Sequence, residues 1–516
     1  MKKNILASLV LALITISLYA QDLNIIWQNT IGGDEEDTLW AMDKTLDGGY
    51  IIGGRSESDI SGDKTVANHG NGTGDFWILK LDANGNILWQ NSIGGTLDDH
   101  LYSLTSTADG GYLLGGLSNS NISGDKTENC MGLSDYWVVK IDTNGNVEWD
   151  NTIGGDDFDN LHSLKQTPDG GYILGGFSSS NISGDKTENS NNGDIWIVKL
   201  NSNGIVEWDN TIGGNGGDGL NNISITNDGG YIIGAESNSN ISGDKTEDAF
   251  DTSGDYWVLK LDSTGNIQWQ NTIGGIGYDS IESISQASDG GYIVSGSSDS
   301  PISGDKTQNS NGLDAWIIKL NSSGNIEWQN TIGGAASDFG GDIIETIDGG
   351  YLIGCTSNSD ISNDKDENSL GEYDIWIVKL TSNGIIEGQN TIGGSLNDGV
   401  MALIQNNYGN YFLAGYSNSN ISGDKTENSQ GDRDYWVLQI DNVLSLEENP
   451  FATTITLYPN PTKNTLQLNT QDKTIDQINI YTMTGSKVLQ LDAETISPTV
   501  DVSSLAAGIY YIQLYS

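Results

Sequence analysis

The sequence predicts an all-β fold in which seven repeated units of four short strands close into a ring, followed by a small separate β domain. A unit of about sixty residues recurs between Trp27 and Asp441, and self-similarity at such a period is the signature of repeat architectures. Strand-forming segments fill each unit between polar loops, and Asn-Gly or Asp-Gly pairs separate several of them. This alternation favours antiparallel hairpins over helices.

Four short motifs mark the copies. A Trp-Gln-Asn-Thr-Ile-Gly-Gly run starts, with small changes, at Trp27, Trp89, Trp149, Trp208, Trp269 and Trp328, and at Gly388 with glycine replacing tryptophan. An Asp-Gly-Gly-Tyr motif starts at Asp47, Asp109, Asp169, Asp228, Asp289 and Asp348. An Ile-Ser-Gly-Asp-Lys motif starts at Ile60, Ile122, Ile182, Ile241, Ile302 and Ile421, with asparagine for glycine in the copy at Ile361. An aspartate precedes a tryptophan by two residues at Trp77, Trp137, Trp196, Trp257, Trp316, Trp376 and Trp436.

One copy shows how the unit divides into strands. The apolar segment Gly171–Gly176 is the predicted first strand, and Ser178–Gly193 is a long polar loop. Asp194–Leu200, rich in strand formers, is the second strand. Ile205–Gly214 is the returning third strand and Leu220–Thr226 the fourth.

The turn between the second and third strands sets the register. The pair Asn144-Gly145 predicts a two-residue turn in which both residues have positive φ. Lys140 then pairs with Trp149, and Trp137 pairs with Thr152, so the two tryptophans face opposite sides of the sheet. A sheet stacked between two neighbours needs large apolar groups on both faces, and we therefore interpret the tryptophans as packing residues.

A repeated lysine in the second strand also has a predicted structural role. We expect its stem to lie along the tryptophan of the third strand. A catalytic role is disfavoured because an active site is rarely needed in every unit. The residues are Lys80, Lys140, Lys199, Lys260, Lys319 and Lys379.

The glycines of the first strand suggest its place in the ring. Gly53-Gly54, Gly115-Gly116 and Gly175-Gly176 allow close backbone approach, so we predict that this strand is innermost. The strand order with its Asp-Gly turn resembles the WD-repeat β-propeller, although the Trp-Asp dipeptides of that family are missing. The resemblance covers the repeats only and implies a seven-bladed β-propeller.

The strands at the two ends of the repeat region predict how the ring closes. The first copy starts with a third strand (Asn24–Ile31) and a fourth strand (Leu39–Thr45), whereas the last copy ends after its second strand (Tyr435–Ile440). We predict that both N-terminal strands complete the last blade, which leaves no exposed sheet edge. The alternative is an open β-solenoid, for which a four-stranded unit of about sixty residues would be long.

The two ends of the chain predict export. Residues 1–20 have the charged start, apolar run and small-residue end of a signal peptide, and the apolar run is too short for a transmembrane anchor. Residues 21–441 form the predicted propeller, 442–451 a linker and 452–516 a final domain. The mature chain is predicted to have no transmembrane anchor.

The final domain contains Leu457-Tyr458-Pro459-Asn460-Pro461, Ile478-Asn479-Ile480-Tyr481 and Ala507-Gly508-Ile509-Tyr510-Tyr511. These segments resemble the C-terminal sorting domain of the type IX secretion system, found in the Bacteroidetes. The resemblance implies a small β-sandwich, recognition by the export machinery and delivery to the cell surface or the exterior.

The charge excludes some partners. The formal net charge is −48, from 70 acidic and 22 basic residues, and such a field repels nucleic acid and anionic membranes. We expect a monomer with no nucleic-acid partner. Cys130 and Cys355 lie in distant units, so no disulfide is expected between them.

Two acidic loops should lie on one face, since strands alternate in direction. The loop after the first strand carries Asp63, Asp125, Asp185, Asp244, Asp305, Asp364 and Asp424. The loop after the third strand carries Asp37, Asp99, Asp159, Asp218, Asp279, Asp338 and Asp398. Oxygen-rich loops can hold calcium, but no copy has the spacing of an EF-hand, and we favour hydrogen bonds to turn amides.

No motif points to catalysis. His69, His100 and His162 fall in different units and do not repeat, which disfavours a metal triad. A nucleophile elbow and a phosphate loop are absent from the sequence. Paired carboxylates for glycoside hydrolysis stay open, because acids are abundant. We assign no catalytic or metal-ligating residue and no cofactor.

One repeat position varies widely. The residue after the first-strand glycines takes every chemical class, and all seven should ring one mouth of the central channel. They are Arg55, Leu117, Phe177, Glu236, Ser297, Thr356 and Tyr416. This ring is the candidate binding site, and relaxed constraint at a solvent-filled mouth is the alternative.

The sequence therefore predicts an exported, non-catalytic propeller that acts in binding, adhesion or scaffolding. Its partner would be a glycan or a surface protein. The near-identity of the copies favours this function, because specialised sites erode repeat symmetry. There are two alternatives: an exported polysaccharide-active enzyme and a passive surface-layer component. The enzyme alternative is supported only by analogy of the export route.

Overall fold

The computed structural model describes residues 12–13, 25–441 except 71, 407 and 408, and 456–458, 464–469, 474–482, 487–505 and 510–515. The chain divides into two compact units, one of Asp22–Asn442 and one of Met1–Gln21 with Val443–Ser516. The predicted linker and, apart from two residues, the predicted signal peptide lie outside the described residues.

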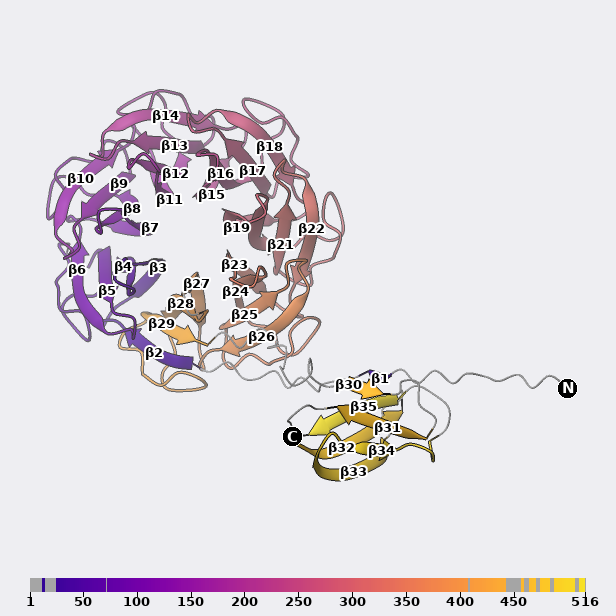
Figure 1. Ribbon diagram of the computed structural model, residues 1–516. Coiled ribbons are helices and arrows are strands. Elements are labelled where there is room, and N and C mark those ends of the chain that lie inside the picture. Colours follow the sequence, from indigo (N-terminus) through magenta and orange to yellow (C-terminus); the bar gives the residue numbers. More distant parts are fainter. Residues whose placement is uncertain are drawn as a thin grey trace. The chain divides into compact units, whose positions relative to one another are not determined.

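The larger unit is the predicted seven-bladed β-propeller, with seven four-stranded antiparallel sheets around a central axis (Figure 1). The innermost strands are β3 (Asp37–Lys44), β7 (Asp99–Ser106), β11 (Asp159–Gln166), β15 (Asp218–Ile225), β19 (Asp279–Gln286), β23 (Asp338–Glu345) and β27 (Asp398–Gln405). The next strands outward are β4 (Tyr50–Ser56), β8 (Tyr112–Ser118), β12 (Tyr172–Ser178), β16 (Tyr231–Ser237), β20 (Tyr292–Ser298), β24 (Tyr351–Ser357) and β28 (Tyr411–Ser417).

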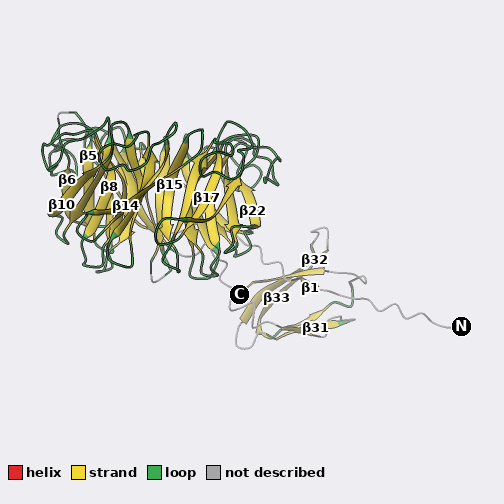
Figure 2. Ribbon diagram, turned by 90° about the horizontal axis from the view of Figure 1, so that it is seen from above, coloured by secondary structure: helices red, strands yellow, loops and turns green. Residues whose placement is uncertain are grey.

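The outer half of each blade contains the two tryptophan-bearing strands. The third strands outward are β5 (Asp75–Leu81), β9 (Asp135–Ile141), β13 (Asp194–Leu200), β17 (Asp255–Leu261), β21 (Asp314–Leu320), β25 (Asp374–Leu380) and β29 (Asp434–Ile440). The outermost strands are β6 (Ile87–Ile93), β10 (Val147–Ile153), β14 (Val206–Ile212), β18 (Ile267–Ile273), β22 (Ile326–Ile332), β26 (Ile386–Ile392) and β2 (Ile25–Ile31). Figure 2 shows the blades from the side, with loops at both ends of the strands.

The prediction that the glycine strand is innermost was wrong, because that strand is second in every blade. The glycines serve a different contact. A Cβ on Gly53 would lie 3.0 Å from Leu101 Cδ2 of the next blade, and one on Gly54 would lie 1.9 Å from the Thr38 carbonyl oxygen. The close approach is therefore to the innermost strands of the same and the next blade, not to the channel axis.

Ring closure uses one N-terminal strand, where we had predicted two. The last blade has the order β2-β29-β28-β27, and β3 begins the first blade instead. Trp27 lies opposite Gln439, and Thr30 opposite Trp436, so the two ends of the repeat region form one sheet. In Figure 1 the indigo β2 lies beside the orange β29.

The hairpin turn also differs from the prediction. Gly145 has φ of +82°, but Asn144 is not among the described residues with positive φ. The Gly145 amide donates to the Asp142 carbonyl at 3.1 Å, and the register shifts between Val147 and Trp149. A turn with one left-handed glycine and a bulge thus replaces the two-residue turn. The predicted pairs Trp149 with Lys140 and Thr152 with Trp137 are nevertheless confirmed.

Both faces of each blade are packed against a neighbour. Trp137 is fully buried in one interblade cluster, whereas half-buried Trp149 packs against the cluster on the opposite face. The prediction of two packed faces is confirmed. The tryptophans of the third strands outward are all fully buried: Trp77, Trp137, Trp196, Trp257, Trp316, Trp376 and Trp436.

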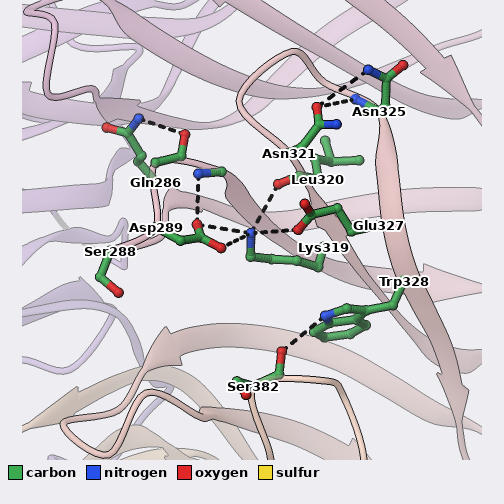
Figure 3. A network of polar contacts seen from close by, with 12 residues as sticks. Gln286, Ser288, Asp289, Lys319, Leu320, Asn321, Asn325, Glu327, Trp328 and Ser382 are labelled. Carbon is green, nitrogen blue, oxygen red and sulfur yellow. Dashed lines mark hydrogen bonds and ion pairs between the residues drawn. The ribbon is translucent and has the colours of Figure 1, made fainter.

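The repeated lysine of the second sequence strand forms ion pairs. Lys319 Nζ lies 2.8 Å from Asp289 Oδ2 and 3.4 Å from Glu327 Oε2 (Figure 3). The short cation–tryptophan contacts belong to the other repeated lysine, as in Lys306 Nζ, 4.6 Å from the centre of the Trp316 ring. Lys319 itself lies opposite Trp328, the third-strand tryptophan that we expected its stem to follow, and the packing of the stem stays a prediction.

The smaller unit contains two small sheets. Its strands are β1 (Ala12–Leu13), β30 (Thr456–Tyr458), β31 (Thr465–Asn469), β32 (Thr474–Thr482), β33 (Lys487–Ile496), β34 (Thr499–Asp501) and β35 (Tyr510–Tyr515). The sheets have the orders β1-β35-β32-β33 and β30-β31-β34. One apolar core, which includes Leu468 and Ile478, joins them, as predicted for a small β-sandwich.

Candidate binding site in the central channel

The repeated acidic residues build the loops. Asp99 Oδ2 accepts hydrogen bonds from the Gly95 amide at 2.6 Å and the Ser120 hydroxyl at 3.1 Å. Asp125 Oδ2 accepts one from the Gly94 amide at 3.2 Å. These are the turn-amide bonds that we favoured over calcium ligation. Within the described residues, no three His, Cys, Asp or Glu side chains are placed to hold a metal ion.

The other repeated polar residues connect strands and loops. Asn151 Nδ2 donates to the Gly204 carbonyl of the next blade at 2.7 Å. The Lys186 ammonium donates to the Thr211 hydroxyl at 2.6 Å. Trp328 Nε1 donates to the Ser382 carbonyl of the next blade at 3.1 Å (Figure 3). The constant part of the repeat is thus accounted for by blade construction.

A cavity of about 800 Å³ occupies the central channel and is lined by the innermost strand of every blade. This volume is within the usual range of small-molecule sites, roughly 300–1,000 Å³. The fourth residue of each innermost strand lies on its wall, and this position differs in every blade. The seven residues are Trp40, Tyr102, His162, Asn221, Glu282, Gly341 and Met401.

A β-bulge accompanies this ring of seven residues, which we call the bulge ring. The pairing between innermost and second strands shifts across Trp40 in the first blade and across Tyr102 in the second, and equivalent shifts occur in the others. A bulged residue is released from the ladder, and bulges commonly re-aim a side chain near functional sites. The preceding residue stays buried and apolar in six blades: Leu39, Leu101, Leu161, Leu220, Ile281 and Val400.

Three adjacent members of the bulge ring form an aromatic arc. The ring centres of Trp40 and Tyr102 are 5.5 Å apart at an interplanar angle of 62°. Those of Tyr102 and His162 are also 5.5 Å apart, at 59°. His100 stacks on Tyr102 at 6.0 Å, and burial, followed by the positive charge of Arg55, lowers the pKa of His100 to about 4. Burial also lowers the pKa of His162, so the arc presents uncharged ring surface.

The next two members are polar. His162 Nδ1 lies 3.0 Å from the Leu220 carbonyl, and Asn221 Nδ2 donates to the Ile281 carbonyl at 2.6 Å. Both side chains are therefore held by the following blade. Among the described residues, none donates a hydrogen bond to the Glu282 carboxylate, which faces the channel. Partial loss of solvation in the channel, and then the charge of Glu236, raise its pKa above the usual range, while the side chain stays exposed to the cavity.

The sequence-predicted ring lies on the second strands, where its members pair with the second residue of each innermost strand. Arg55, for example, lies opposite Thr38, and Tyr416 opposite Gly399. Three members contribute to the cavity lining: Ser297, Thr356 and Tyr416. The other four, Arg55, Leu117, Phe177 and Glu236, do not line it.

Two of those four side chains have polar partners. Arg55 Nη2 lies 2.7 Å from Asp98 Oδ1, and the guanidinium also pairs with Glu57. Glu236 Oε2 accepts a hydrogen bond from the Tyr278 hydroxyl at 3.0 Å. Leu117 and Phe177 are half-buried. The structure therefore divides the predicted ring into members that line the cavity and members that contact other residues.

Sequence reasoning missed the bulge ring because the wrong strand was placed innermost. The signal was present in the sequence. Each innermost strand begins with an aspartate, and the residue three positions later is of a different type in each of the seven blades. Periodicity could not show that this residue is bulged, since a bulge shifts the strand's alternation by one residue.

A comparison with family models identifies the end of the chain. Residues 456–516 match the model described as a secretion system C-terminal sorting domain. The chain is thus a seven-bladed β-propeller with a type IX sorting domain, which indicates handling by the type IX machinery and secretion to the cell surface or outside. No curated protein sequence matches the chain. Among the described residues, no helix is long and apolar enough to cross a membrane.

Solved structures with a similar fold are distant in sequence. BamB from Moraxella catarrhalis is 12% identical, with 81% of this chain and 99% of that chain covered and a TM-score of 0.37. The Pan2 WD40 domain from Neurospora crassa is 10% identical, with 82% and 96% covered and a TM-score of 0.44. A puromycin hydrolase is 10% identical, with 93% and 67% covered and a TM-score of 0.45.

Proposed function

We propose that this exported protein is a non-catalytic binding module whose ligand enters the central channel. The observation that carries the proposal is the contrast between a nearly constant repeat and seven different residues in the bulge ring. A passive scaffold would gain nothing from such variation among the side chains that face the channel. A binding site needs different groups at defined places around its ligand.

The ligand would be a glycan or a segment of a surface protein, bound by a monomer without a metal cofactor. The lining supports binding over chemistry, because several of its polar residues are held in hydrogen bonds within the wall. Asp342, for example, accepts hydrogen bonds from the Ser283 hydroxyl at 2.9 Å and the Leu403 amide at 3.0 Å. Such groups are poorly placed to exchange protons with a substrate.

The experiment is a glycan array probed with the labelled full chain, in the presence of calcium and of a chelator, together with a reducing-sugar assay on the same glycans. We expect binding that survives the chelator and no release of reducing ends. Release of sugar would contradict the non-catalytic function and favour a polysaccharide-active enzyme. Binding lost on chelation would contradict the metal-free site.

A second candidate is adhesion to a surface protein through the loop face. The first residue of the Ile-Ser-Gly-Asp-Lys motif is 60–64% exposed in all seven blades, at Ile60, Ile122, Ile182, Ile241, Ile302, Ile361 and Ile421. Seven equivalent exposed apolar side chains on one set of loops suit a multivalent contact. Replacing three of them with serine should weaken adhesion of intact cells to their surface partner, whereas the channel variant Trp40→Ala should not.

A further inference from the structure

We propose that the bulge ring binds a neutral saccharide, whose pyranose ring packs on the aromatic arc of Trp40 and Tyr102 while its hydroxyl groups bond to Glu282 and Asn221. This inference deepens the proposed function and depends on it. It names the class of ligand and the residues that select it.

The aromatic arc suits one face of a sugar. An aromatic ring has a negative face that attracts slightly positive C–H bonds, and the axial C–H bonds of a pyranose form such a patch. Trp40 is 37% exposed although it points into the channel. Its edge-to-face contact with Tyr102 keeps the two rings inclined to each other rather than stacked, so ring surface stays open to a ligand.

The polar part of the bulge ring suits the sugar's hydroxyl groups. The Glu282 carboxylate has free acceptor capacity, as no described residue donates to it. Asn221 uses its Nδ2 group on the Ile281 carbonyl and also forms a hydrogen bond with the His162 ring, which fixes the amide and leaves one lone pair of Oδ1 for a further donor. Both groups mainly accept hydrogen bonds, and the hydroxyl groups of a sugar can donate them.

The remaining members provide space. Gly341 has no side chain, and the cavity of about 800 Å³ is large enough for a short oligosaccharide. Trp40 and Met401 belong to the first and last blades, so the bulge ring continues across the junction between these two blades.

Charge argues for a neutral sugar. The net charge of −48 disfavours sulfated sugars and uronic acids. Lys165 adds a positive charge to the channel wall, so a cationic ligand meets attraction and repulsion together. Binding of a neutral ligand depends on neither the attraction nor the repulsion.

The test is isothermal titration calorimetry of the full chain with cellotriose, xylotriose and mannotriose. Galacturonic acid trimer and choline serve as the anionic and cationic probes. Saturable heat with a neutral trisaccharide, and none with the charged probes, is expected. Binding of choline or of the uronic acid alone would overturn the saccharide inference and leave the channel-binding function standing. Silence with every probe would overturn the saccharide inference, and the glycan array decides the wider function separately.

Variants then locate the site. Trp40→Ala and Tyr102→Ala should weaken the sugar by about tenfold or more, as expected for aromatic anchors. Tyr102→Phe keeps the ring and should stay within about threefold, and Glu282→Gln should weaken binding by about three- to tenfold. Trp89→Ala, on an outer strand, is the matched control and should leave affinity unchanged. Sugar binding that is insensitive to Trp40→Ala and Tyr102→Ala would place the sugar elsewhere and overturn the inference.

Discussion

The outer strands and the channel wall of this propeller differ in how much their sequence varies from blade to blade. On the outer sheets, the same residue does the same work in nearly every blade: Trp137 and its six equivalents are all fully buried between neighbours. On the channel wall, the bulge ring has seven different residues. Stacking is a requirement that every blade shares, whereas a ligand bound in the channel, as proposed here, would meet each blade at a different point. The comparison therefore separates what the fold needs from what a site needs.

The largest effect should come from an outer tryptophan. Trp137→Ala removes a fully buried indole and its hydrogen bond to Asp150, and should lower the free energy of unfolding by about 3–5 kcal/mol. Trp40→Ala, the matched channel variant, should change it by less than about 1 kcal/mol, because Trp40 is 37% exposed. Urea denaturation measures both. Equal losses would remove the distinction between sheet and channel.

The distinction also explains what the sequence could predict. Strand segments, blade number and the register at Trp149 were predictable because each repeats and is overdetermined by packing. The identity of the innermost strand was not predictable, because Gly53 indicates that another segment comes close but not which segment it is. The bulges at Trp40 and Tyr102 break the two-residue alternation that sequence reading depends on. The site was thus hidden by the local irregularity that creates it.

A pH effect on stability should follow from the buried aspartates that begin the third strands outward. Burial raises the pKa of Asp75 and Asp255 to about 7 and that of Asp194 to about 6, from 3.8. The folded chain then holds protons between about pH 4 and 7 that the unfolded chain releases, so stability falls as pH rises through that window. Burial lowers the pKa of Lys186 to about 8 from 10.5, so stability rises again between these values.

The melting temperature should therefore have a minimum near pH 7 to 8 and rise by about 2–5 °C on going to pH 5. Differential scanning calorimetry at several pH values measures it. Asp75→Asn should flatten the acidic side of this dependence, whereas the exposed control Asp360→Asn should leave it unchanged. A melting temperature that rises steadily from pH 5 to pH 8 would contradict the direction of the aspartate shifts.

A smaller effect should come from the asparagine that joins blades. Asn151→Ala removes the hydrogen bond to the Gly204 carbonyl and should cost about 1 kcal/mol. Asn203→Ala changes an exposed residue of the hairpin that contains Gly204, and it should cost less than about 0.5 kcal/mol. If both variants unfold at the same urea concentration, the interblade bond contributes nothing and the constancy of this asparagine needs another reason.

The last effect has the opposite sign and concerns an outer position where the repeat fails. Gly388 lies opposite Lys379, where five other blades pair the equivalent lysine with a tryptophan. In the preceding blade that tryptophan, Trp328, packs 5.9 Å from Tyr351. Gly388→Trp should therefore meet Tyr411 and stabilise the chain by about 0.5–1.5 kcal/mol, beyond any gain from the control Gly388→Ala.

A gain would show that the missing tryptophan is a loss the fold tolerates, in contrast to the bulge ring, where restoring uniformity should abolish binding without stabilising anything. A loss of stability with Gly388→Trp would mean that the last interface differs in shape from the others. In that case variation on the outer sheets has a structural cause too, and variation alone would no longer distinguish the channel as the functional region.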